Sequence, residues 1–210
     1  STAASELYRK DFVVFAGAGV EDTPNWRELL EGIKNEASIP EEVVEADRVR
    51  ECPESDFPDV AQDMYDYMDD EGRNEEWYST IGDLLQSLDS RYFPQQIEIC
   101  CTTPYVVTTN FSETFEEAFQ RSPHLDPSEG PEAINSSSLP NFCSNDLSDG
   151  PSVIYLHGRA NLQHIVFTRE LYEANYPSSH SYCRMSKLER FLADLYEEKT
   201  LVFVGVSFDD

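Results

Sequence analysis

The stretch FVVFAGAGV, residues 12–20, predicts how the chain begins its fold. Its first five residues form an apolar run, rich in β-branched side chains, that closes at Gly17, as is typical of a buried strand. The glycines allow a tight turn and let backbone N–H groups approach a pyrophosphate, although a structural turn alone also explains them. An amphipathic helical pattern follows. Its apolar face carries Trp26, Leu29, Leu30 and Ile33.

Similar apolar runs recur along the chain and alternate with amphipathic helical patterns. The further predicted strands are TPYVVTT (residues 103–109), SVIYL (152–156), HIVFT (164–168) and TLVFVG (200–205). This alternation predicts an α/β fold in which helices cover both faces of a parallel sheet. We expect the strands at residues 12–16, 105–108, 153–156 and 201–204 to occupy the central positions of that sheet.

Two segments interrupt the alternation. Residues 41–76 carry fifteen acidic residues against three arginines, which favours a solvated, partly mobile helical insertion over about residues 38–90. Residues 121–150 are rich in Pro, Ser, Asn and Asp and are predicted to form a long surface connection. We interpret residues 1–210 as a single domain. Because the chain stops directly after a predicted strand, we expect a longer protein that continues past residue 210.

The composition excludes several classes of protein. With 40% hydrophobic and 12% aromatic residues, a chain of 210 residues can form a globular core. A formal net charge of −26 repels phosphate backbones and anionic lipids, so we expect binding to neither nucleic acids nor membranes. The sequence shows no membrane-length apolar run and no leader-like start, which predicts a cytoplasmic protein. The five cysteines are odd in number and form no CxxC pair, so we expect neither a zinc ribbon nor a disulfide framework.

The first two strands end in residues that suit ligand binding. In open parallel sheets, ligands bind beyond the carboxyl ends of the strands. The loop GAGV (residues 17–20) lies at the first such end, and Asn110 lies at the second. The Asn110 amide can both donate and accept, so it can hold a ribose hydroxyl or a water, but it also suits a cap for the helix that starts near Ser112.

Two later strands end in a similar way. His157, followed by Gly158, stands where a general base is useful at neutral pH, although a structural histidine held by hydrogen bonds fits the same position. Gly205 and Ser207 follow the last strand, where backbone and hydroxyl groups can reach a ribose or an adenine. An ordinary turn between a strand and a helix is the alternative for this pair.

The four motifs form an ordered set: GAG, TTN, LHG and GxS, each closing a predicted strand. This order resembles the sirtuin-like superfamily. It is most similar to the zinc-free sirtuin-like domains that act as NAD-consuming effectors in bacterial and archaeal anti-phage defence proteins. The resemblance runs from about residue 12 to residue 210. It rests on FVVFAGAGV, PNWRELL, VVTTNFSETFEEAF, VIYLHG, IVFTRELYEANY and LVFVGVSFDD.

The resemblance implies a Rossmann-like domain that binds NAD+ beside a helical subdomain, without a zinc module. Asn110 and His157 match the catalytic Asn and His of the family. The loop Gly17-Ala18-Gly19-Val20 is expected at the phosphates. The other positions implied to contact NAD+ are Pro24, Trp26, Thr109, Gly205, Ser207 and Phe208.

The implied activity is cleavage of NAD+ to nicotinamide and ADP-ribose in abortive-infection defence. The resemblance also implies a homo-oligomer, such as a tetramer, that a sensor domain or a phage component activates. The presence of both Asn110 and His157 favours this enzyme. Two departures favour an alternative, a sirtuin-like domain that binds NAD or ADP-ribose as a sensor or structural module without turnover. Ser112 stands where relatives often carry Asp, and only Glu21-Asp22-Thr23 separate GAGV from PNW, where relatives carry a longer loop.

Overall fold

A five-stranded parallel sheet forms the centre of the protein. The computed structural model describes residues 12–20, 25–86, 94–122, 130–135, 150–159, 165–176 and 186–206. The strands are β1 (Phe12–Ala16), β2 (Tyr105–Thr108), β3 (Glu132–Asn135), β4 (Ser152–Tyr155) and β5 (Thr200–Val204). They lie in the order β3-β4-β2-β1-β5, and every neighbouring pair is parallel. The predicted α/β class is therefore confirmed.

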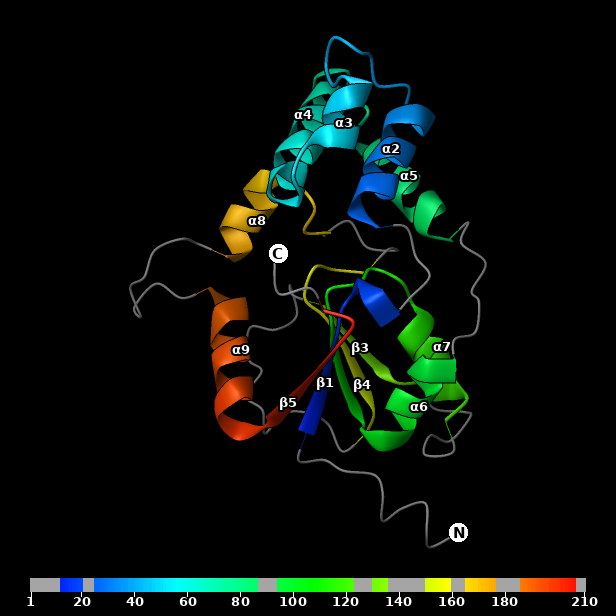
Figure 1. Cartoon of the computed structure of the whole chain (residues 1–210), viewed down its shortest axis with the longest axis vertical. Helices are drawn as coiled ribbons and strands as arrows, with labels where there is room; N and C mark the ends of the chain where they lie inside the picture. Colours follow the sequence, from blue (N-terminus) through cyan, green and yellow to red (C-terminus); the bar gives the residue numbers. More distant parts are fainter. Residues whose placement is uncertain are drawn as a thin grey trace, which may run out of the picture.

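Helices cover both faces of the sheet (Figure 1). Helix α9 (Lys187–Glu198) lies on one face, and α6 (Pro94–Thr102) and α7 (Thr114–Gln120) lie on the other. Alternate strand residues point to opposite faces. Val13 and Val107 accordingly join the apolar cluster under α9, whereas Val14 and Val106 join the cluster under α6 and α7. This double burial explains why β1, β2 and β4 have continuous apolar runs, whereas β5 leaves Val202 and Phe203 exposed.

A group of helices lies beyond the carboxyl ends of the strands (Figure 1). We call it the helical module. It comprises α2 (Trp26–Glu36), α3 (Ala46–Glu51), α4 (Phe57–Asp70), α5 (Asn74–Gln86) and α8 (Arg169–Asn175), with the short helix η2 (Glu54–Asp56) before α4. Although α8 is distant in sequence, it packs on α4, where Arg169 pairs with Asp59 at 2.9 Å. The Gln62 side chain also accepts the Glu170 N–H at 3.1 Å.

The acidic segment within this module is built around a core. In α4 the side chains of Phe57, Val60, Met64 and Met68 are at most 4% exposed, and Trp77 of α5 is 2% exposed. The segment is helical, as predicted. It is not solvated all round, because one side of its helices is buried in a core. Few apolar residues suffice because they recur at helical spacing and share one side.

Three details of the predicted sheet need correction. Strand β3 lies inside residues 121–150, which were expected to form only a surface connection. Residues 165–168 of the predicted strand HIVFT form no strand; Ile165 and Phe167 instead pack into the core of the helical module. Within the described part of the chain, β5 lies at an edge of the sheet and not in a central position. None of the described helices is long and apolar enough to cross a membrane.

Candidate active site

The carboxyl ends of β1, β2, β4 and β5 lie level with one another. Ala16 of β1 is in register with Thr108 of β2 and with Val204 of β5, and Thr108 is in register with Tyr155 of β4. Asn110 lies two residues after Thr108, and His157 lies two residues after Tyr155, the partner of Thr108 on the neighbouring strand. Because neighbouring strands lie about 4.8 Å apart, the fold brings together the starts of two loops, although 46 residues lie between Asn110 and His157 in the sequence.

The loops after β1 and β5 fit closely against each other. Gly17 N–H donates to Val204 O at 3.0 Å, and Gly19 N–H donates to Gly205 O at 2.9 Å. A Cβ on Gly17 would lie 2.5 Å from Gly205 O, and a Cβ on Gly205 would lie 2.6 Å from Val20 N. Gly205 also has a φ of +64°, which side chains disfavour. Close approach of two backbones therefore explains these glycines.

The predicted phosphate role of the glycine loop stays a prediction. The N–H groups of Gly17, Gly19 and Val20 all donate to protein carbonyls in this structure. Ala18 and Gly19 are exposed within the short helix η1 (Ala18–Val20), so the small surface of this loop is open to a ligand. The loop combines a structural turn with an accessible backbone, and the two sequence interpretations are compatible.

Asn110 is held by the glycine loop and does not cap a helix. Its side-chain N–H donates to Gly17 O at 3.1 Å, and its backbone N–H donates to Thr108 Oγ1 at 3.0 Å. Helix α7 has Glu113 as its N-cap residue, so the capping interpretation of Asn110 is wrong. The Asn110 side chain is only 7% exposed. One of its two amide N–H groups is thus committed to the loop after β1.

Ser112 belongs to a polar chain that leads away from Asn110. Its hydroxyl lies 2.9 Å from Thr114 Oγ1, which in turn accepts the Gln96 side-chain N–H at 2.8 Å. This chain ties the loop after β2 to α6. Ser112 is therefore hydrogen-bonded to the first residue of α7, Thr114.

His157 is enclosed by aromatic side chains. Nε2 lies 3.0 Å from the Tyr176 hydroxyl and Nδ1 lies 3.4 Å from the Tyr172 hydroxyl. The rings of both tyrosines meet the imidazole edge-on, and the Phe111 ring centroid lies 6.4 Å away. His157 is 9% exposed. These contacts are those of a structural histidine, and its catalytic role stays a prediction.

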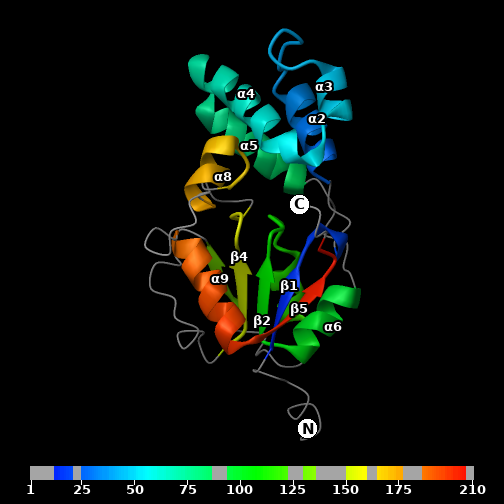
Figure 2. The ribbon, with the colours of Figure 1, turned by 60° about the vertical axis from the view of Figure 1, so that its left-hand side comes forward.

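Sequence reasoning missed both tyrosines. They stand four residues apart within the motif IVFTRELYEANY: Tyr172 lies in α8, and Tyr176 is the residue that caps its end, where its N–H donates to Tyr172 O at 2.7 Å. That spacing was the available signal. Figure 2 shows α8 above the carboxyl end of β4.

An ion pair joins the two loops that carry Asn110 and His157. The Arg159 guanidinium binds Glu116 through two hydrogen bonds of 2.8 Å and lies 3.1 Å from Glu113. The Tyr155 hydroxyl donates to the same Glu116 carboxylate at 2.9 Å. Arg159 follows His157 closely, and Glu113 follows Asn110. The pairing therefore fixes the two loops relative to each other, a role that no local sequence pattern revealed.

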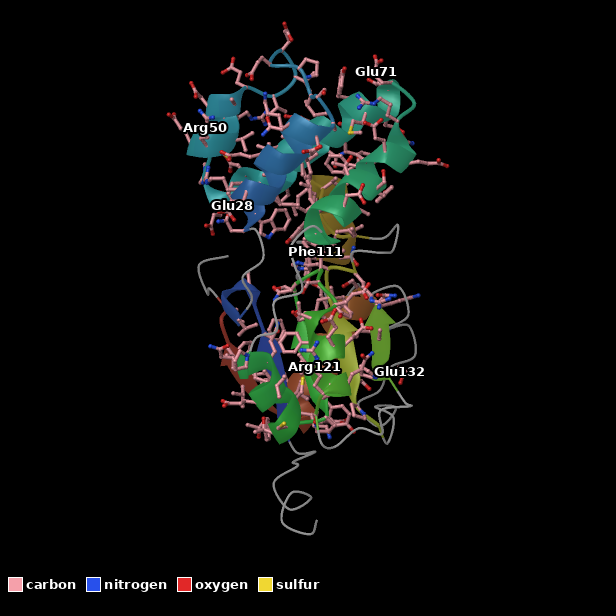
Figure 3. The ribbon with its side chains drawn as sticks, turned by 90° about the vertical axis from the view of Figure 1, so that its right-hand side faces the viewer. Glu28, Arg50, Glu71, Phe111, Arg121 and Glu132 are labelled. Carbon is pink, nitrogen blue, oxygen red and sulfur yellow. The ribbon has the colours of Figure 1, made fainter. Side chains whose placement is uncertain are left out.

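Trp26 lies in an aromatic cluster between the helical module and the strand ends. It stacks on Phe167 with a centroid distance of 4.5 Å, and its ring centroid lies 6.4 Å from that of Phe111 and 6.0 Å from that of Tyr172. Figure 3 shows Phe111 at the junction of the two parts of the molecule. Thr109 directly precedes Asn110 and is half-buried. The predicted contacts Pro24, Ser207 and Phe208 lie outside the described residues.

The comparison with protein families identifies this arrangement. The sequence model of the SIR2-like domain matches residues 104–210, just over half of the chain. The chain belongs to the SIR2-like family. SIR2-like domains bind NAD+ and are NAD-dependent enzymes, which relates this chain to NAD+. The match includes Asn110, His157 and Gly205. No curated protein matches the chain. Within the described residues, no three His, Cys, Asp or Glu side chains gather as metal ligands would.

Burial controls the protonation of His157 in this SIR2-like domain. Removal from water lowers the pKa of His157 from 6.5 to about 4, because the charged imidazolium loses its hydration. His157 is therefore neutral at pH 7, with one N–H and one lone pair. A neutral imidazole can accept a proton, as a general base must.

The lowered pKa predicts a loss of stability in acid. Above pH 6.5, His157 is neutral in both the folded and the unfolded chain. Between pH 6.5 and about pH 4, His157 is protonated in the unfolded chain but stays neutral in the folded one, which favours unfolding. Between pH 7 and 5, the free energy of unfolding should fall by about 2 kcal/mol more in the wild type than in His157→Gln. Urea titrations of both proteins measure this difference. If the difference in free energy of unfolding between wild type and His157→Gln did not change with pH, the imidazole would be hydrated in the folded protein in solution.

Proposed function

We propose that this SIR2-like domain is an NAD+ glycohydrolase. The observation that supports this most is the level arrangement of Asn110 and His157 on neighbouring strands, beside the closely fitted loops after β1 and β5. The chain leaves β1 toward β2 on one side and returns as β5 on the other. Such a switch point is where open α/β sheets bind nucleotides.

The reaction cleaves the bond between ribose C1′ and the nicotinamide nitrogen. The bonding electron pair moves to the ring nitrogen and neutralises its positive charge, so nicotinamide departs easily. Water adds its oxygen to C1′ and loses a proton, and the products are nicotinamide, ADP-ribose and H+. His157 would accept the proton from water or from a ribose hydroxyl, and Asn110 would orient the oxygen that attacks. No metal takes part in this scheme.

The burial of His157 shapes what it can contribute. At neutral pH nearly every molecule holds the base form, because the pKa of His157 is about 4. The same low pKa makes the imidazole a weak base, so its effect rests largely on orientation and on transfer of the proton within a hydrogen bond. We therefore expect a contribution of about 10²–10³ to the rate, in the lower part of the usual range.

Release of nicotinamide tests the proposal. The protein is mixed with NAD+, and nicotinamide and ADP-ribose are quantified by chromatography. Asn110→Ala should lower kcat by about 10²-fold, because the attacking oxygen loses its orienting amide. Asn35→Ala, at an exposed position of α2, serves as the matched control and should leave kcat unchanged. Equal turnover of wild type and Asn110→Ala would contradict the proposal.

The alternative is a domain that binds NAD+ or ADP-ribose without turnover. The observation that favours it is the contact of both His157 nitrogens with tyrosine hydroxyls. Calorimetric binding of NAD+ without nicotinamide release would select this alternative.

The proposal extends to the cellular setting. A zinc-free NADase of this type would act in the cytoplasm in abortive-infection defence against phage. It would assemble as a homo-oligomer, such as a tetramer, and await a sensor domain or a phage component. Light scattering that finds only monomers, with and without activator, would count against the assembly.

A further inference from the structure

Two tyrosines, Tyr172 in α8 and Tyr176 directly after it, approach His157 from different surroundings. Tyr176 packs against the apolar cluster between the sheet and α9. Tyr172 instead faces the aromatic cluster of the helical module, where its ring centroid lies 6.0 Å from that of Trp26. The two hydroxyls therefore hold opposite sides of one imidazole, one toward the interior and one toward the module.

The protonation state of His157 makes these two hydrogen bonds unequal. A neutral imidazole carries one N–H and one lone pair, so one tyrosine hydroxyl must accept a hydrogen bond and the other must donate one. The distances also differ, at 3.0 Å for Tyr176 on Nε2 and 3.4 Å for Tyr172 on Nδ1. The shorter bond is of normal strength, whereas the longer one is near the limit for a hydrogen bond.

We propose that Tyr176 is a positioning residue whose hydroxyl accepts the Nε2 proton of His157 and so leaves the Nδ1 lone pair as the proton acceptor. The proposal rests on the proposed function for its chemical role. Nδ1 faces Tyr172, which lies on the same side as Trp26 and Phe111; Phe111 directly follows Asn110. The long bond from Tyr172 is the one that a ribose hydroxyl or a water can replace.

The helical module fixes this arrangement. Arg169 and Glu170, at the start of α8, bind Asp59 and Gln62 of α4, so the helix that carries Tyr172 and ends at Tyr176 is anchored on the module. The loop before α8 is anchored on the site itself, because Val166 N–H donates to His157 O at 2.7 Å. The module therefore determines which side of the imidazole each hydroxyl reaches.

Among the described residues, the two tyrosine hydroxyls are the hydrogen-bond partners of the imidazole nitrogens and can therefore select the tautomer. The Phe111 ring, whose centroid lies 6.4 Å from that of the imidazole, is apolar and cannot select a tautomer. Within the described part of the chain, no charged side chain forms a hydrogen bond or ion pair with His157. Burial raises the pKa of Tyr176, so its hydroxyl stays protonated and available at all ordinary pH values.

Nitrogen NMR of the histidine side chains tests the assignment without any need for catalysis. Long-range proton–nitrogen spectra distinguish the two neutral tautomers, and the His157 signals are those that vanish in His157→Gln. We expect the Nε2–H tautomer in the wild type. Tyr176→Phe should turn it into a mixture, whereas Tyr172→Phe should keep the Nε2–H form. A wild-type Nδ1–H tautomer, or an unchanged tautomer in Tyr176→Phe, would overturn the proposal.

Acid titration in the same spectra gives a second readout with a defined sign. A hydroxyl that accepts from the imidazole favours the protonated ring, so Tyr176→Phe should lower the pKa of His157 further. A hydroxyl that donates favours the neutral ring, so Tyr172→Phe should raise that pKa. A merely structural role for Tyr176 predicts no such opposite shifts, and shifts of the same sign would refute the assignment.

Kinetics then connect the tautomer to the reaction. Tyr176→Phe should lower kcat for NAD+ cleavage about tenfold, the factor that one ordinary hydrogen bond supplies, with KM unchanged. Tyr196→Phe, at an exposed position of α9, is the matched control and should leave kcat unchanged. A loss of kcat in Tyr172→Phe alone would reverse the roles of the two tyrosines and overturn the proposal. Absence of cleavage in the wild type would refute the proposed function and the proton-accepting role of Nδ1, while the spectra would still decide whether Tyr176 sets the tautomer.

Discussion

His157→Gln is expected to lower kcat for NAD+ cleavage by about 10²–10³-fold, with a change in KM of less than about threefold. Glutamine keeps a polar side chain of comparable length between the two tyrosines but cannot accept a proton at neutral pH. The loss should therefore fall on the chemical step and not on the binding of NAD+. Single-turnover measurements of nicotinamide release, together with calorimetric binding of NAD+, separate the two effects.

The choice of glutamine follows from the burial of the site. The sequence predicted His157 at a strand end where a general base is useful. The structure places the imidazole among three aromatic rings with 9% exposure, so alanine would create a cavity and weaken the packing. Arg48→Gln, which removes an exposed ion pair with Asp63 in the helical module, is the control and should keep full activity. Undiminished cleavage by His157→Gln would remove His157 from the mechanism.

The sequence predicted four of the five strands because each is a continuous apolar run. Strand β3 escaped prediction because its sequence, EAIN, buries only Ile134 and takes part in the sheet through a single neighbour, β4. HIVFT gave the opposite error. Its apolar residues are buried, but helices bury them, and a short apolar run carries no information about which kind of element will cover it.

The sequence predicted where Asn110 and His157 lie in the sheet but not which residues they contact. Strand ends can be read from local sequence, and Asn110 and His157 do lie at equivalent ends of neighbouring strands. Their partners come from far away along the chain. Gly17 is 93 residues from Asn110, and Tyr176 is 19 residues from His157. Whether an asparagine caps a helix or holds a distant carbonyl depends on the packing of the whole sheet, which no local pattern encodes.

Gly205→Ala is expected to lower the free energy of unfolding by about 4 kcal/mol, among the largest effects of a single substitution. The new Cβ would lie 2.6 Å from Val20 N and 2.7 Å from Gly19 C, both backbone atoms that cannot move aside as a flexible side chain can. The loops after β1 and β5 would have to separate, which breaks the 2.9 Å bond from Gly19 N–H to Gly205 O. Urea titration of both proteins measures the change.

Gly72→Ala isolates the effect of this contact from that of backbone strain. Gly72 has a φ of +71°, close to the +64° of Gly205, but a Cβ there would meet nothing within 4 Å. Its substitution should therefore cost only the conformational strain of about 1 kcal/mol. Equal losses at the two positions would show that the loops do not meet in solution. A much larger loss of stability in Gly205→Ala would establish that the close contact with the loop after β1 requires a glycine at position 205. Because Gly17 O also accepts the Asn110 side chain, that displacement should lower NAD+ cleavage in any Gly205→Ala protein that still folds.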